Sequence, residues 1–94
     1  MTVHIRIPQA LAGDVAGSSE LTVDIVPGST LGELMAVLRT RYPALARRLC
    51  DETGELRRFV NVYVGEHESR SLQGLATPLP AGALVLVAGS VAGG

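Results

Sequence analysis

The chain has 94 residues, 47% of them hydrophobic, and its formal net charge at pH 7 is −1. This length suits one domain with a modest core, and the near-neutral charge argues against a general nucleic-acid binder. A single cysteine excludes an internal disulfide and a cysteine-based zinc cage. With one phenylalanine, two tyrosines and no tryptophan, the core must be mainly aliphatic.

The first two predicted elements are strands. Apolar and polar side chains alternate over residues 3–7 and again over 21–25, a period typical of half-buried strands. Pro8 ends the first strand, and Pro27-Gly28 breaks the second. The first residues have no basic segment followed by an apolar stretch, so we expect no signal peptide and a cytoplasmic protein.

A helix follows. Thr30 and Glu33 have the spacing of a capping box, in which each side chain bonds the other residue's backbone amide. Leucines then recur at helical spacing, which predicts a helix from about Leu31 to Arg41. Pro43 prevents its continuation. A short second helical turn is expected over 44–49.

The second half of the chain predicts two more strands. Residues 59–64 give the strongest β signal, and Gly65 begins a tight turn after them. Residues 71–76 are expected to be irregular. The last strand, 83–88, is apolar on both faces, a pattern that favours the middle of a sheet.

This order of elements predicts an α+β fold, the β-grasp or ubiquitin-like roll: a mixed sheet with one main helix packed on one face. Residues 1–88 would form the domain, and 89–94 a flexible tail that leaves the end of the central strand. Five side chains are expected in the core between helix and sheet: Ile25, Leu34, Leu38, Val60 and Val62.

The tail has unusual chemistry. No ionisable side chain follows Arg70, and the printed sequence ends in Gly93 and Gly94. Residues without a Cβ can be threaded into a narrow site, and six extended residues reach at most about 20 Å. A terminal carboxylate can attack the α-phosphate of ATP, and the resulting acyl-adenylate accepts sulfur or an amine.

Three segments resemble the bacterial sulfur-carrier proteins of the ThiS/MoaD family, and within it the CysO type most. They are Leu56-Arg-Arg-Phe-Val-Asn-Val-Tyr-Val64, Gly74-Leu-Ala-Thr77 and Val91-Ala-Gly-Gly94. Glu66, Glu68 and Arg70, between the first two segments, belong to the same resemblance. The resemblance covers essentially the whole chain. One departure is that Gly89-Ser90 stands where the family usually carries a proline before the tail.

The resemblance implies a protein co-substrate that is not itself an enzyme and binds no cofactor. A ubiquitin-activating-type enzyme, similar to MoeB or ThiF, would use ATP and Mg to adenylate Gly94, and Gly93 would allow threading. Sulfide or a persulfide would then give a thiocarboxylate. A synthase, cysteine synthase-like or another, would take the sulfur for cysteine biosynthesis, molybdopterin, thiazole or a specialised metabolite such as a thiosugar.

We expect a partner-binding surface beside the tail. Phe59 and Tyr63, with one face of strand 83–88, would form an exposed apolar patch, and such patches commonly mark partner sites. Arg57 and Arg58 would add charge to this surface. Val91 and Ala92 of the tail would complete it, and the free protein is expected to be a monomer.

The remaining chemistry-bearing residues have plainer interpretations. Cys50 is expected to be a small buried hydrophobe, and His4 and His67 surface histidines. Six arginines fall within a stretch of twenty residues, which fits either a docking surface for an acidic partner or a solvated helix end. They are Arg39, Arg41, Arg47, Arg48, Arg57 and Arg58.

Two other functions remain open at this point. One is a ubiquitin-like modifier conjugated to lysines of other proteins through Gly94. The other is a β-grasp interaction domain with an inert tail. An enzyme in its own right is the least favoured class, because no catalytic triad, carboxylate pair or phosphate loop is evident.

Overall fold

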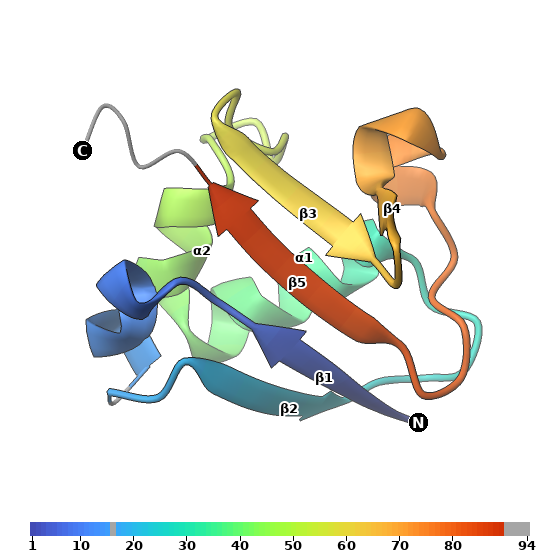
Figure 1. Ribbon diagram of the computed structural model, residues 1–94, viewed down its shortest axis with the longest axis horizontal. Coiled ribbons are helices and arrows are strands. Elements are labelled where there is room, and N and C mark those ends of the chain that lie inside the picture. The colour runs from blue at the N-terminus through green and yellow to red at the C-terminus, as the bar shows by residue number, and fades with distance from the viewer. Residues whose placement is uncertain (16, 90–94) are drawn as a thin grey trace.

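The computed structural model describes residues 1–15 and 17–89, which form a five-stranded sheet with two α-helices on one face (Figure 1). In chain order, its strands and α-helices are β1 (Thr2–Arg6), β2 (Glu20–Asp24), α1 (Leu31–Arg41), α2 (Pro43–Leu49), β3 (Val60–Val64), β4 (His67–Glu68) and β5 (Leu84–Gly89). Short 3-10 helices cover η1 (Gln9–Val15), η2 (Ser69–Ser71) and η3 (Gly74–Ala76).

The sheet is mixed, with strand order β2-β1-β5-β3-β4. β1 and β5 run parallel, whereas β1 with β2, β3 with β5 and β3 with β4 run antiparallel. The last strand therefore lies at the centre, as its apolar sequence predicts. This topology, with the helices on one side, confirms the β-grasp fold.

The predicted helix is also confirmed, with the expected bounds. The Thr30 amide donates to Glu33 Oε1 at 3.0 Å, and the Glu33 amide donates to Thr30 Oγ1 at 3.2 Å, which completes the capping box. The helix ends at Tyr42, whose amide still donates to the Leu38 carbonyl, and Pro43 opens α2. Proline suits the first turn of a helix, where no amide partner is needed.

The core lies between the helices and one face of the sheet. Alternate side chains of each strand point inward, as Val3 and Ile5 do on β1 and Val85 and Val87 on β5. Of the five predicted core residues, four are buried: Ile25, Leu34, Leu38 and Val62. The fifth, Val60, is half-buried and packs at the core's edge, because it opens β3 at the end of the sheet.

Three regions differ from the predictions. Residues 71–76, expected to be irregular, include the end of η2 and the whole of η3. Residues 9–15, expected as a plain connection, form η1, whose Leu11 and Ala12 are buried. Residues 67–68 form the edge strand β4 after a turn at Gly65, whose φ of 62° confirms the expected left-handed conformation. The helices of the described residues are all too short or too polar to cross a membrane.

Candidate functional site

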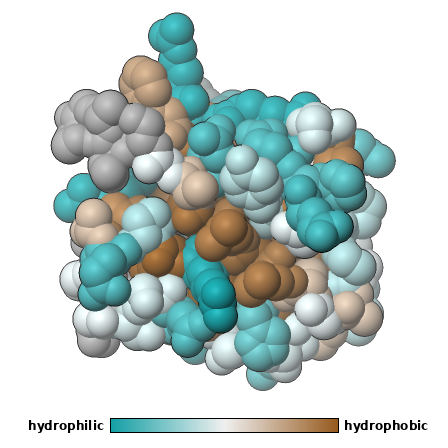
Figure 2. Space-filling view, in the orientation of Figure 1, coloured by the Kyte–Doolittle hydropathy of each residue, from teal (hydrophilic) through white to brown (hydrophobic). Residues whose placement is uncertain are grey.

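The face of the sheet opposite the helices is open. On it, the register sets Arg6 of β1 beside Leu86 of β5, and Leu86 beside Tyr63 of β3. His4 lies beside Leu84 in the next row. This face looks toward the viewer in Figure 1, and Figure 2 shows hydrophobic side chains gathered at its middle.

An exposed apolar patch therefore exists where the sequence predicts one; we define it as Tyr63, Leu84 and Leu86. The two leucines are 42% and 39% exposed, and Tyr63 is half-buried. A central strand whose outer side chains remain open to solvent is typical of a surface that a partner covers.

The rim of the patch is polar. Arg6 Nε and Glu20 Oε1 form an ion pair at 3.0 Å, with both side chains well exposed. Such a pair contributes little to stability. Glu68 of β4 lies beside Tyr63 on the other side. An apolar centre with a charged rim is the usual anatomy of a protein interface.

Phe59 lies at the point where the described chain ends. Its side chain is 57% exposed, and the Arg58 guanidinium stands 5.9 Å from the ring centroid. Gly89 is the register partner of Val60, and a Cβ added to Gly89 would lie only 3.4 Å from the Phe59 carbonyl oxygen. Phe59, with Arg58 over its ring, thus lies beside the residue from which the chain continues toward its terminal glycines.

Arg70, which the sequence singles out only as part of the family resemblance, connects the elements at this corner. Its guanidinium donates to Asn61 Oδ1 at 3.2 Å, to Glu68 Oε1 at 3.1 Å and to the Arg57 carbonyl at 2.9 Å. One side chain therefore joins β3, β4 and the loop before Phe59. The contacts of Arg70 were not predicted, because β4, the strand that it helps to hold, was itself not predicted.

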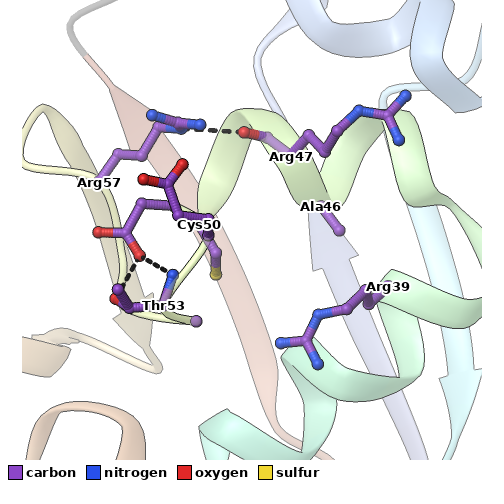
Figure 3. A pocket seen from close by; sticks show the side chains of 9 residues that line it. Arg39, Ala46, Arg47, Cys50, Thr53 and Arg57 are labelled. Carbon is purple, nitrogen blue, oxygen red and sulfur yellow. Dashed lines mark hydrogen bonds between the residues drawn. The ribbon is translucent and has the colours of Figure 1, made fainter.

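Arg57 has a different orientation from Phe59 and Tyr63. Its Nε donates to the Arg47 carbonyl at 2.9 Å, so its side chain is directed toward α2 (Figure 3). The structure therefore brings Tyr63 and the strand leucines together on one face and places Phe59 and Arg58 at its end. Arg57 lines a separate hollow.

Cys50, His4 and His67 lie where the sequence predicts them. Cys50 is buried with 6% exposure, and burial raises the pKa of its thiol, an effect that the Arg39 guanidinium partly opposes. Both histidines are exposed. Residues 1–15 and 17–89 contain no group of three histidine, cysteine or acidic residues placed to hold a metal ion.

The predicted tail residues Val91, Ala92, Gly93 and Gly94 lie outside the described residues. Their roles remain predictions. What the structure does place is Gly89, at the end of the central strand and beside Phe59.

No family model matches the chain, but the comparisons with individual proteins find similar sequences and structures. The sulfur carrier protein CysO of Mycobacterium tuberculosis is 35% identical over 96 residues, covering 100% of both chains. The small archaeal modifier protein 3 of Haloferax volcanii is 35% identical over 81 residues, 86% of this chain and 87% of that protein.

Among solved structures, the crystal structure of the BexX/CysO complex of Amycolatopsis orientalis matches with a TM-score of 0.82 and 29% identity, covering 98% of this chain and 99% of that one. The full-length similarity to CysO, together with the β-grasp topology and the open sheet face, carries the assignment. This chain belongs to the CysO-type sulfur carrier proteins of the ThiS/MoaD family.

Proposed function

We propose that Gly94 of this sulfur carrier is adenylated by an ATP-dependent activating enzyme and converted to a thiocarboxylate, which then donates sulfur to a biosynthetic synthase. The observation that supports this most strongly is full-length similarity to proteins named sulfur carriers. In this role the chain is a co-substrate. Adenosine phosphates and Mg belong to the activating enzyme.

The position of the end of β5 supports this role for the terminal glycines. β5 ends at Gly89 next to the exposed Phe59, and the five residues that follow it can span at most about 18 Å. A partner that covers the sheet face can therefore hold the domain in place while the chain end enters its active site. Positioning of this kind contributes to rate because reacting atoms must be aligned within about 1 Å.

The same apolar patch would serve both partners in turn. The activating enzyme, which we expect to be similar to MoeB or ThiF, must release the carrier before the synthase can accept sulfur from it. The CysO of the BexX/CysO complex binds a partner protein. A patch that lies on the central strand leading to the tail suits both docking events, and it makes the two partners compete.

The test is ATP–pyrophosphate exchange by the activating enzyme with three forms of the carrier. Removing Gly94 should abolish exchange, because the shortened chain places its carboxylate out of line with the α-phosphate. Gly93→Val should also fail, because a β-branched side chain adds bulk and restricts the backbone angles needed for threading.

The matched control for Gly93→Val is Ser90→Ala, which alters the same segment without adding bulk. Circular dichroism should show the same fold for all four proteins. Exchange at the wild-type rate by the protein that lacks Gly94 would refute the assignment of the reactive end.

A second candidate function is conjugation to lysines of other proteins, and the similarity to small archaeal modifier protein 3 is the observation that favours it. Both functions share adenylation of Gly94 and differ in the next nucleophile, sulfur or an amine. Denaturing gels of cell extract probed for this protein distinguish them, because conjugation produces a ladder of heavier species that sulfur transfer does not.

A further inference from the structure

A hollow of about 420 Å³ lies on the helical side of the molecule, away from the open sheet face. The residues around it come from the end of α1, from α2 and from the turn that follows α2. They are Arg39, Ala46, Arg47, Cys50, Asp51, Glu52, Thr53, Gly54 and Arg57. The proposed sulfur-carrier function uses none of these residues.

Two arginines stand on opposite sides of this hollow, with Cys50 between them (Figure 3). The Arg39 guanidinium forms no hydrogen bond or ion pair with the residues that the structure describes. Arg57 is fixed by its Nε bond to the Arg47 carbonyl, which leaves its two terminal nitrogens without a bond to any described residue. The Arg47 side chain itself runs away from the hollow (Figure 3).

The nearby acidic groups form no hydrogen bond with these guanidiniums, although Arg57 acts electrostatically on the Asp51 carboxyl and helps to lower its pKa. Asp51 Oδ1 accepts from the Thr53 amide at 2.8 Å, from the Thr53 hydroxyl at 2.6 Å and from the Glu55 amide at 3.2 Å. Its carboxylate is thus used to close the turn. Glu52 is exposed and forms no ion pair with a described residue.

The field of both arginines reaches the floor of the hollow. Burial raises the pKa of the Cys50 thiol, and the Asp51 and Glu55 carboxylates raise it further, whereas Arg39 and Arg57 act in the opposite direction. Both guanidiniums therefore act electrostatically on this point of the hollow. Among the side chains that line the hollow, Ala46 offers no polar atom and Cys50 only a weak donor, whereas the Arg39 and Arg57 guanidiniums offer several N–H donors.

We propose that this hollow binds a diphosphate group, held at one end by Arg39 and at the other by Arg57. Planar guanidiniums suit phosphate oxygens because they donate two parallel hydrogen bonds. A single phosphate would engage one of the two guanidiniums, which lie on opposite sides of Cys50 (Figure 3), whereas two linked phosphates offer a group to each. The hollow also exceeds the size of one phosphate, and its volume falls in the range of small-molecule sites.

The ligand chemistry has two sources, free pyrophosphate or a nucleoside diphosphate. Titrations of the full chain with pyrophosphate, ADP and inorganic phosphate, each without metal, are followed by calorimetry and by the amide resonances of Thr53 and Gly54. We expect pyrophosphate to bind at least about tenfold more tightly than inorganic phosphate, which corresponds to one additional set of charge-assisted hydrogen bonds. Binding of ADP at similar strength would assign the site to the nucleotide, and weaker binding of ADP to the free anion.

The variants Arg39→Ala and Arg57→Ala should each lower pyrophosphate affinity at least about tenfold, and Arg39→Lys should restore it only in part, because lysine keeps the charge but not the fork. Arg41→Ala is the matched control: it removes the same charge from the same helix but does not line the hollow.

Three results would overturn the proposal: no binding of pyrophosphate by the wild-type chain, equal affinity for phosphate and pyrophosphate, or an equal loss of affinity in Arg41→Ala. The last would show attraction to the arginine-rich end in general.

Discussion

At the scale of single residues, the Asp51 side chain holds the turn that follows α2. This turn lies between the hollow and the end of the open sheet face. The hydrogen bonds of Asp51 to Thr53 and Glu55 close the turn. These bonds, the Thr53 hydroxyl first, lower the pKa of the Asp51 carboxyl below its ordinary value. The chain continues from this turn to Arg57, Arg58 and Phe59. The stability of the turn therefore affects the positions of residues in both the hollow and the end of the sheet face.

Asp51→Asn tests this role through pH. Because the native-state pKa is depressed, the ionised carboxylate stabilises the fold above the ordinary pKa of about 3.9, and this contribution is lost as pH falls through the lower native value. Chemical denaturation at several pH values should show a less stable variant at neutral pH and a shallower loss of stability in acid. Glu52→Gln, which removes a charge from the same turn, is the control, and an equal effect there would contradict the assignment.

Tyr63 is the residue of the apolar patch whose removal should matter most, because aromatic side chains are frequent interface anchors. Tyr63→Ala is expected to weaken binding to the activating enzyme and to the synthase by at least about 1 kcal/mol each. Binding is measured by calorimetry, with Thr22→Ala as the control on the same face. Normal binding of Tyr63→Ala to both partners, or its unfolding, would place the docking surface elsewhere.

Arg58 should act differently from Tyr63, because it is a charged residue at the rim. Arg58→Ala is expected to slow association with each partner more than it speeds dissociation, and the effect should fade as ionic strength rises. Stopped-flow association rates at two salt concentrations measure this. A salt-independent effect would show that Arg58 contributes through its contact with the Phe59 ring and not through its charge.

At the scale of elements, each helix or strand was predicted well only where caps, prolines or an apolar period mark it in the sequence. α1 has a capping box at its start and Pro43 shortly after its end, so its bounds follow from the sequence. β4 has two residues, too few for any periodicity, and was missed. η1 was also missed, because Gln9–Val15 lacks a helical apolar period although Leu11 and Ala12 are buried.

The helix stripe offers a direct test of packing. Leu38 is fully buried, so Leu38→Ala should reduce the free energy of unfolding by about 2–5 kcal/mol through lost apolar burial and a residual cavity. Thr40→Ala, on the exposed side of the same helix, should change it by no more than about 0.5 kcal/mol. Thermal or denaturant melts of the two variants measure the difference, and similar values for both would show that α1 is not held by its buried face.

At the scale of the whole molecule, sequence pattern predicted the fold and part of the site. The apolar strand 83–88 indicated a central position, but nothing in it says which side chains face the helices. Pairing with β1 and β3 decides this: Val85 and Val87 point into the core, and Leu84 and Leu86 remain on the open face. Arg57 illustrates the limit, because only tertiary contact with α2 turns it away from its neighbours.

The central claim is that this carrier transports sulfur on Gly94, and the intact mass of the protein tests it most directly. The carrier, its activating enzyme, ATP, Mg and sulfide are incubated together, and the mass is compared with that of the form lacking Gly94. We predict an increase equal to the replacement of one oxygen by sulfur, located on Gly94 by fragmentation and absent from the shortened form. An unchanged mass, or the same increase in the form lacking Gly94, would contradict the account.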